Sequence, residues 1–409
     1  MRMRFNRSSQ LVLVSVFSLL AAGLVTACGT LTADFVYVTS AKAAGSNNYG
    51  EVDVFEVNSE SGKMRQIPTS PFPSGGRNPV AEAVSSDFTT LYVVNQDDNS
   101  IVQFTIGSDG KLYPQNTLNT PGVFPLSVAT TSSFLFVADT YEPLPTCSTA
   151  APCSGSVAVF PILTSAQAGA LTPAEPADSL GPPVANSAVS GNYWPLMLPS
   201  KPTDVMTPTS VTTAAAGAYL YVTAFDATAG GGYVFAFAVN SDGTLTTVNG
   251  SPFQAGTHPS ALVADPSGNY AYVTDFGANQ VLSFAVSSGA LSLVSSTATG
   301  SQPAAIVVDS TGKYAYVANS QDSNVSAYSI SNGAFSALGN YTTGEEPVAI
   351  GLDPSLNQYL YTANFLGNNV SGFQSNPGDG SLLLSQGSPS GANANPTAVA
   401  AIPHGSQKK

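Results

Sequence analysis

Apolar runs that open with a proline recur along most of the chain and are separated by short polar turns. Residues 259–264 and 303–308 illustrate the pattern, because each combines small and aliphatic side chains as a buried strand does. We call such a run strand A. The seven prolines that open it are Pro79, Pro125, Pro208, Pro259, Pro303, Pro347 and Pro396.

Three further runs follow strand A in each repeat. A turn such as residues 265–269 leads to strand B, in which the dipeptide Tyr-Val is frequent. A loop leads on to strand C, and a glycine turn then leads to strand D, which opens with a large apolar residue. Four short strands that recur at this spacing are typical of the blades of a β-propeller.

The two ends of the chain each carry part of one repeat. Residues 35–38, 52–55 and 63–67 predict strands B, C and D with no strand A before them. Residues 396–401 predict a strand A with only a polar tail after it. We therefore expect an all-β fold, a seven-bladed β-propeller of four-stranded antiparallel blades. The C-terminal strand would close the ring by joining the N-terminal blade.

This propeller should span residues 35–402, with insertion loops at 141–155 and 173–207 and a polar tail at 403–409. Composition agrees, since 43% of the 409 residues are hydrophobic and only 9% are charged, with 37 Gly and 29 Pro. That balance favours short strands and tight turns over disorder or helical bundles. The formal net charge of −13 excludes a nucleic-acid partner, because no basic surface is available for phosphates.

The first residues predict an export signal over residues 1–27. Three arginines precede an apolar run at 11–25, which is too short for a confident membrane span, and small residues lead to Cys28. These residues resemble the lipobox of bacterial lipoproteins, which implies acylation of Cys28 and a tether at 28–34. The alternative is cleavage after Ala27, which would release a soluble protein. Either outcome places the protein in or beyond the cell envelope, with membrane contact only through a lipid anchor.

Cys147 and Cys153 lie six residues apart in a proline-containing loop. In an oxidising compartment we expect them to form a disulfide. Two thiols without a nearby histidine fall short of a four-ligand zinc site. We expect neither a metal nor a cofactor.

The loops that join B to C and D to A share one face of the predicted disc, and every long insertion falls there. The 173–207 insertion holds Trp194, the one tryptophan of the chain. Trp194 is a candidate ligand-binding residue on a lid over the channel. The alternative is a surface loop that packs its own aromatic residues.

The residues just before each strand-A proline should surround the mouth of the central channel. They are mostly polar, and the seven pairs are Arg77-Asn78, Val123-Phe124, Met206-Thr207, Thr257-His258, Ser301-Gln302, Glu345-Glu346 and Ala394-Asn395. Polar groups around a concavity indicate a ligand site, with Asn78, Gln302, Glu345 and Asn395 as binding candidates. The alternative is that these polar residues are simply hydrated loop ends.

Glu82 departs from the repeat. It lies three residues after the strand-A proline, where the other repeats have an aliphatic residue. A buried carboxylate is costly unless it is paired or hydrated. Glu82 is either a ligand-binding residue or a structural one that Arg77 or the wet channel stabilises.

The repeats resemble the YVTN class and, over nearly all of the chain after the signal, the seven-bladed lactonase-like propellers. Residues 265–275 and 309–319 carry the resemblance. It implies a lactonase, in which His258, Glu346 and Arg77 would be the catalytic candidates. Family members that act as phosphogluconolactonases typically have Arg-His directly after one strand-A proline, and no repeat of this chain has that pair.

Two functional hypotheses follow. The main one is an exported, monomeric scaffold that binds an envelope protein, a glycan or a small molecule through its loop face and channel mouth. The alternative is a lactonase-like hydrolase that acts on a sugar lactone.

Overall fold

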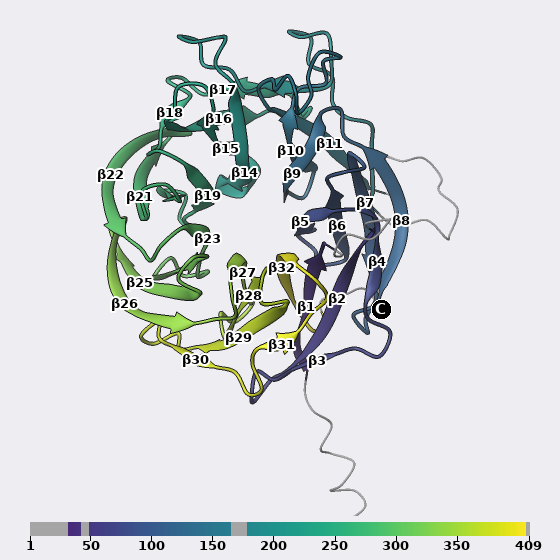
Figure 1. Ribbon diagram of the computed structural model, residues 1–409, viewed down its shortest axis with the longest axis vertical. Helices are drawn as coiled ribbons and strands as arrows, with labels where there is room; N and C mark the ends of the chain where they lie inside the picture. The colour runs from purple at the N-terminus through teal and green to yellow at the C-terminus, as the bar shows by residue number, and fades with distance from the viewer. Residues whose placement is uncertain (1–31, 42–48, 165–177, 406–409) are drawn as a thin grey trace, which may run out of the picture.

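A computed structural model describes residues 32–41, 49–164 and 178–405 of the chain. Seven small antiparallel sheets stand around a central hole (Figure 1), so the fold is the all-β, seven-bladed propeller that the sequence predicts. The one helix within these ranges is a 3-10 turn, η1 (Ala215–Gly217). No helix in the described ranges has the length and apolar character needed to cross a membrane.

The first three blades contain the strands between residues 32 and 195, together with the C-terminal strand. Blade 1 contains β1 (Thr32–Ser40), β2 (Tyr49–Asn58), β3 (Met64–Gln66), β4 (Phe72–Arg77) and β32 (Pro396–Pro403). Blade 2 contains β5 (Pro79–Val84), β6 (Thr90–Asn95), β7 (Ser100–Ile106) and β8 (Leu112–Asn119). Blade 3 contains β9 (Val123–Thr130), β10 (Phe134–Tyr141), β11 (Ser156–Thr164), β12 (Asp178–Leu180) and β13 (Trp194–Pro195).

The remaining four blades complete the ring. Blade 4 contains β14 (Met206–Ala214), β15 (Tyr219–Asp226), β16 (Gly232–Val239), β17 (Leu245–Thr247) and β18 (Phe253–Gln254). Blade 5 contains β19 (Pro259–Ala264), β20 (Tyr270–Asp275), β21 (Gln280–Ser287) and β22 (Ala290–Ala298). Blade 6 contains β23 (Pro303–Val308), β24 (Tyr314–Asn319), β25 (Asn324–Ser331) and β26 (Ala334–Thr342). Blade 7 contains β27 (Pro347–Leu352), β28 (Tyr359–Asn364), β29 (Asn369–Ser375), β30 (Leu382–Leu384) and β31 (Ser390–Gly391).

The ring closes through the two ends of the chain. Strand β32 pairs antiparallel with β1, with Phe35 opposite Ile402 and Val38 opposite Val399. Ile402 is fully buried in an apolar cluster shared by blades 1 and 2. The predicted pairing of the chain ends is therefore confirmed, and β1 is paired along both of its edges.

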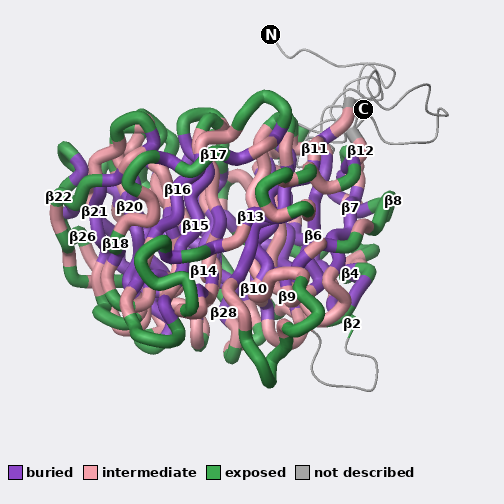
Figure 2. Tube along the Cα trace, turned by 90° about the horizontal axis from the view of Figure 1, so that it is seen from above, coloured by how far each residue is buried: buried purple, intermediate pink, exposed green. Residues whose placement is uncertain are grey.

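The core consists of apolar layers between neighbouring blades, and buried strand centres lie between two rows of exposed turns (Figure 2). The tyrosine of the Tyr-Val repeat explains part of this packing. The hydroxyl of Tyr37 donates to the carbonyl of Gly110, and that of Tyr221 donates to Gly289, both at 3.0 Å. Each bond joins strand B of one blade to the turn before strand D of the next blade.

Blade 3 differs from the other repeats at its outer edge, because the 173–207 insertion follows its strand C. In the structure, β12 and β13 both pair with β11. Part of the 173–207 insertion therefore completes the blade. Its two short strands supply hydrogen-bond partners for the outer edge of β11.

Removing residues 396–409 should unfold the protein, because β1 loses its ladder partner and the cluster around Phe35 loses Ile402. We expect no cooperative melting transition by circular dichroism and aggregation on size-exclusion chromatography. Removing only residues 406–409 is the control and should leave melting unchanged. A folded, monomeric protein after the longer deletion would contradict closure by β32.

Candidate functional site

A β-bulge at the start of strand A shapes the channel mouth in every blade. The ladder between strands A and B skips the residue that follows the strand-A proline, for example Ser260 between Pro259 and Ala261. The skipped residues are Val80, Leu126, Thr209, Ser260, Ala304, Val348 and Thr397. A bulge redirects a side chain away from the regular pleat. Val80 packs against the apolar cluster between blades 2 and 3, whereas Leu126, Thr209 and Ser260 line a pocket at the mouth.

A short Gly-x-x-Pro segment positions the residues before the proline in five blades. In blade 5, Gly256 has φ +73 and lies so close to the end of β20 that an added Cβ would be 2.0 Å from an oxygen of Asp275. Glycine is therefore required there. The glycines at the same place in blades 2, 3, 6 and 7 also pack against the Asn or Asp that ends strand B.

A pocket of about 320 Å³ opens at the mouth where blades 3, 4 and 5 meet. Its lining residues are Leu126, Pro208, Thr209, His258, Ser260 and Phe276. Three of them are bulge residues, and His258 is the titratable group. Larger hollows of about 470 to 490 Å³ exist elsewhere, but none of those is lined by a histidine or by a residue of the channel mouth.

His258 is half-buried between two aromatic rings. Its ring centroid lies 4.1 Å from that of Phe225 and 5.7 Å from that of Phe276. Burial lowers the pKa of His258, although the nearby charge of Asp275 acts in the opposite direction. The imidazole is therefore neutral near pH 7 and can accept a proton.

Hydroxyl groups beside His258 tie neighbouring blades together. Thr209 Oγ1 donates to the carbonyl of Pro259 at 2.8 Å, and Ser260 Oγ donates to that of Pro303 at 2.6 Å. Each hydroxyl also lies 2.8 Å from a second hydroxyl, that of Thr223 beside Thr209 and that of Thr274 beside Ser260. With its proton engaged by a carbonyl, each oxygen keeps one lone pair for the pocket. They can accept hydrogen bonds from the hydroxyl groups of a ligand.

The other two catalytic candidates do not line the His258 pocket. Arg77 is exposed, and its Nε donates to Asp98 Oδ1 at 2.6 Å. Its guanidinium also lies within ion-pair distance of Asp98. Glu346 is half-buried at the start of blade 7, and its carbonyl accepts a hydrogen bond from the N–H of Phe365. The structure thus places His258, Arg77 and Glu346 on three different blades.

The binding candidates lie around the same rim. Asn78 donates to Gln96 and Asp97, and Asn395 donates to the carbonyl of Phe365. Gln302 is adjacent to blade 5, and its side-chain amide makes no hydrogen bond within the described part of the chain. Gln302 therefore leaves two N–H donors for a ligand.

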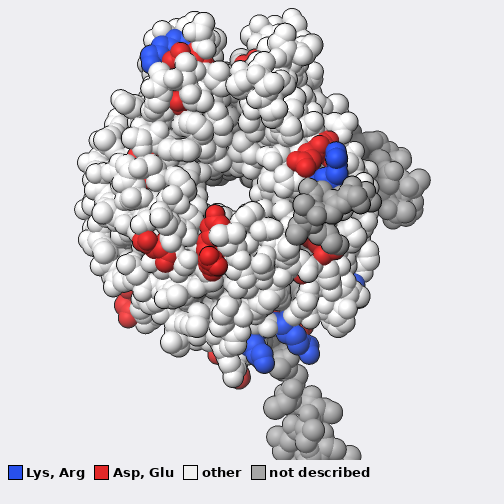
Figure 3. All heavy atoms as spheres, in the orientation of Figure 1, with Lys and Arg blue, Asp and Glu red and all other residues white. Residues whose placement is uncertain are grey.

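The mouth carries unbalanced negative charge on one side. Acidic atoms gather at the rim of the open central hole over β23 and β27 (Figure 3). Glu345 and Glu346 directly precede β27, and Glu345 is exposed. An anionic ligand approaching this side of the hole would be repelled.

Glu82 lies in the wall between blades 1 and 2. The hydroxyl of Thr39 donates to its Oε2, whereas its Oε1 is buried without a partner among the described residues. Burial raises the pKa of Glu82 to about 8, against the hydrogen bonds from Thr39 and the backbone of Ala400. The carboxyl is therefore mostly protonated at pH 7, and Arg77 is engaged by Asp98 rather than by Glu82.

Trp194 lies away from the pocket. Its side chain is 7% exposed and packs in the cluster between blades 3 and 4, and its indole N–H donates to the carbonyl of Leu245 at 3.2 Å. The structure thus places the ring of Trp194 in the core between two blades. Trp194 also lines a separate hollow of about 470 Å³, together with Thr244 and Leu245.

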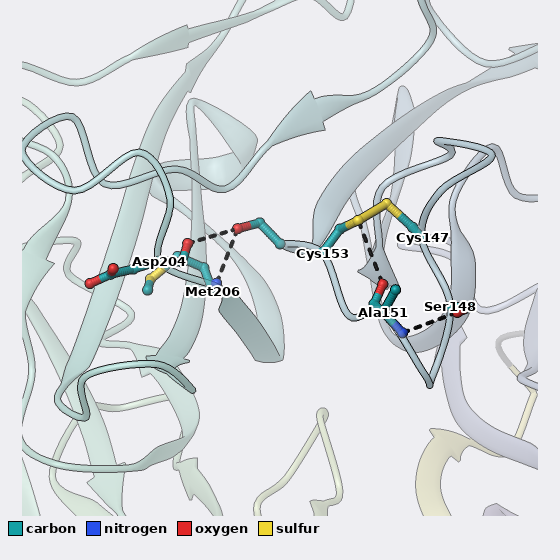
Figure 4. The surroundings of a disulfide bond; sticks show 7 residues. Cys147, Ser148, Ala151, Cys153, Asp204 and Met206 are labelled. Atoms are coloured by element: carbon teal, nitrogen blue, oxygen red, sulfur yellow. Dashed lines mark hydrogen bonds between the residues drawn. A yellow bond between two sulfur atoms is a disulfide. The ribbon is translucent and has the colours of Figure 1, made fainter.

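Cys147 and Cys153 form the predicted disulfide, with their Cα atoms 5.4 Å apart (Figure 4). The adjacent Ser154 is bonded to the segment that leads into blade 4. Its Oγ accepts from the N–H of Met206 at 3.1 Å and donates to the carbonyl of Asp204 at 3.2 Å. The bridged loop thus supports the backbone just before Pro208, which lines the pocket. Cys28 lies outside the described residues.

Several pocket residues were missed by sequence reasoning. The prediction considered the residues before each strand-A proline, and it therefore included His258. Thr209, Ser260 and Leu126 follow a proline and were not considered. The aromatic residues Phe225 and Phe276 lie at or just after the end of strand B. A comparison of the repeats at these two positions would have indicated them.

Comparisons with known proteins agree with the architecture. Residues 35–386 match the family model described as "Lactonase, 7-bladed beta-propeller". A candidate 6-phosphogluconolactonase from Bacteroides fragilis is similar with a TM-score of 0.71 at 20% identity, over 91% of this chain and 99% of that one. The periplasmic gluconolactonase of Pseudomonas aeruginosa is similar with a TM-score of 0.70 at 18% identity, over 90% and 99%. No curated protein matches the chain. At these identities the structural similarity shows a shared fold.

Replacing Glu82 with Leu should stabilise the protein at pH 8. A carboxyl whose pKa is raised by folding stabilises the fold at low pH and loses that contribution as pH rises. For Glu82 the loss falls between its ordinary value of 4.5 and about 8. We expect a gain on the order of 3 kcal/mol over the parent at pH 8 and a smaller difference at pH 5. Urea unfolding at both pH values measures it.

Glu82→Gln is the control, because it removes the ionisation and keeps the shape of the side chain. The difference in unfolding free energy between the parent and Glu82→Gln should grow in favour of the variant from pH 5 to pH 8. A difference that does not change with pH would contradict a protonated Glu82.

Proposed function

The chain belongs to the seven-bladed beta-propeller lactonase family, and from that premise we propose that it hydrolyses uncharged lactones at the mouth pocket of blades 3, 4 and 5. The observation that carries the proposal is the half-buried, neutral His258, which lies in a pocket lined by apolar and hydroxyl groups. A sugar lactone has the matching chemistry, because its ring is compact and its hydroxyls are hydrogen-bond donors.

In the proposed reaction a ring nitrogen of His258 takes a proton from water as the water oxygen attacks the lactone carbonyl carbon. The acyl C–O bond of the ring then breaks. The proton on His258 passes to the ring oxygen that leaves, and the product is an open-chain hydroxy acid. Thr209 and Ser260, which line the pocket with His258, would orient the substrate hydroxyls.

The charge at the mouth supports an unphosphorylated substrate. Glu345 and Glu346 add negative charge to the rim, and Arg77 is engaged by Asp98. The Arg-His pair typical of the phosphogluconolactonases is absent from every repeat. The residues that take the place of that arginine are the bulge residues, which here are apolar or carry a hydroxyl.

The absence of the Arg-His pair also favours a second candidate function, in which the propeller binds its ligand without a chemical reaction. Without the arginine, the pocket lining has no cationic donor for the developing oxyanion, and the protons of Thr209 and Ser260 are engaged by backbone carbonyls. Ligand binding at the same pocket with no turnover would favour this scaffold over the hydrolase.

We also propose that the protein is exported and acylated at Cys28. The disulfide between Cys147 and Cys153 supports an oxidising compartment. In a bacterial host we expect labelling with radioactive palmitate and recovery in the membrane fraction. Both should be lost in Cys28→Ala and retained in Cys147→Ala. Equal labelling in the parent and in Cys28→Ala would contradict acylation at this residue.

The direct test of the hydrolase is turnover on a panel of unphosphorylated aldonolactones, with 6-phosphogluconolactone as the charged comparison. We expect enzymatic hydrolysis above the spontaneous rate, and a loss of roughly a hundredfold or more in kcat/KM for His258→Ala. His404→Ala is the matched control, because His404 is the other histidine of the chain and lies against Phe35 in the C-terminal segment. It should retain the activity of the parent.

The pH profile provides a further check. A base must be deprotonated to act, so activity falls as pH drops through the pKa of His258. Because that pKa is lowered, activity should persist on the acid side of 6.5, the ordinary value for histidine. No turnover on any lactone, or full turnover in His258→Ala, would contradict the proposal.

A further inference from the structure

The backbone of His258 is bonded differently from that of its counterparts in other blades. In four blades, the N–H of the residue before the strand-A proline donates to the loop between strands B and C of the preceding blade. These bonds run from Phe124 to Asn99, from Gln302 to Asn279, from Glu346 to Ser323 and from Asn395 to Asn368, at 2.7 to 3.5 Å. The four donor residues have a left-handed φ between 56 and 57.

His258 has neither feature. Its N–H donates at 2.9 Å to Oδ1 of Asp275, which ends strand B of its own blade, and its φ is not left-handed. The neighbouring N–H of Thr257 donates to Oδ2 of Asp275 at 3.0 Å, and the hydroxyl of Thr257 donates to Oδ1 at 2.9 Å. One carboxylate thus holds two consecutive residues of the mouth.

Asp275 is built to remain ionised. Its side chain is fully buried, and Gln280 adds a fourth hydrogen bond at 3.3 Å. Burial alone would raise the pKa of Asp275, but the bonds from His258, Thr257 and Gln280 outweigh it and hold the pKa below its usual value. Oδ2 also packs closely against Gly256, where a Cβ would lie only 2.0 Å from it.

Blade 3 has an aspartate at the same place in the repeat that lacks this role. Asp139 lies opposite Pro125 in blade 3, as Asp275 lies opposite Pro259 in blade 5, but the N–H of Phe124 donates to Asn99 instead. Burial raises the pKa of Asp139 to about 7. An aspartate at this place therefore does not always accept a hydrogen bond from the residue before the strand-A proline. Asp139 accepts none from Phe124, whereas Asp275 accepts one from His258.

We propose that Asp275 is the positioning residue of His258: its carboxylate turns the 257–258 backbone toward blade 5, sets the imidazole between Phe225 and Phe276, and supplies the negative charge that favours the imidazolium formed during proton transfer. The proposal rests on the lactone hydrolysis proposed above. The two rings in contact with the imidazole are uncharged: Phe225 from β15 and Phe276 from the segment after β20. The residues that line the pocket with His258 are uncharged as well, namely Leu126, Pro208, Thr209 and Ser260.

The test is Asp275→Asn, which keeps the size of the side chain and removes its charge. Because the favourable charge is lost, the pKa of His258 should fall further below its ordinary value, as measured by NMR titration of the imidazole protons. The acid limb of the kcat/KM profile should move to lower pH by the same amount. The value of kcat/KM at its plateau should fall about tenfold to a hundredfold, because the imidazole is displaced.

Asp139→Asn is the matched control, since it removes the carboxyl at the same place in blade 3. It should change neither the titration of His258 nor the kcat/KM profile. If Asp275→Asn does not fold, Thr257→Ala removes only the hydroxyl bond to the same carboxylate. It should lower kcat/KM and change the imidazole chemical shifts of His258.

The outcomes separate the two proposals. A parent protein that hydrolyses no lactone overturns the proposed function, whatever the titration of His258 shows. An active parent in which Asp275→Asn, or Thr257→Ala in its place, leaves both the His258 titration and kcat/KM unchanged overturns the role of Asp275 and leaves the hydrolase standing.

Discussion

The pairing of β1 with β32 is the constraint on which the rest of the molecule depends. A seven-bladed ring brings residues from distant repeats to one channel mouth only if it is closed, and closure here depends on one antiparallel ladder between the chain ends. The ladder gives blade 1 its inner strand and places Ile402 in the apolar layer between blades 1 and 2. Without it, blades 1 and 7 would each expose an apolar face to water.

The blades of this ring share the same local backbone features and differ in the side chains that these features carry. The strand-A proline is buried in all seven blades, and the bulge that follows it redirects one side chain away from the regular pleat. The glycine three residues before the proline allows the Asn or Asp at the end of strand B to approach the backbone. Blade 5 differs in using an ionised aspartate and a histidine at these places. The candidate chemistry thus arises from changes of side chain within a constant backbone.

The sequence was sufficient to predict the architecture. Seven prolines marked the repeats, and the incomplete repeats at the two ends implied closure, because an isolated strand A at residue 396 had no other partner. Proximity within a blade also followed from sequence, as with Cys147 and Cys153. Strand D of blade 3 was missed, because β12 is only three residues long and lies in an insertion.

The candidate site was less predictable. The sequence placed His258, Arg77 and Glu346 around one mouth, but it could not show that Asp98 engages Arg77 or that Trp194 packs between blades. Those outcomes depend on side-chain directions and on partners in other loops. Thr209 and Ser260 directly follow their prolines in the sequence, but their place in the pocket depends on a β-bulge. A regular strand would have turned these side chains in another direction. A pocket between blades is a tertiary feature, and no single repeat encodes it.

The central claim is that the hollow between blades 3, 4 and 5 is the lactone site. The most direct measurement is a crystal structure determined after crystals of the protein have been soaked with a lactam analogue of an aldonolactone. In this analogue a ring N–H replaces the ring oxygen, so the ring resists hydrolysis. The account predicts density for the analogue in this pocket, with its ring against Phe276 and its carbonyl carbon near His258. Density in another hollow, with the His258 pocket filled only by solvent, would contradict it.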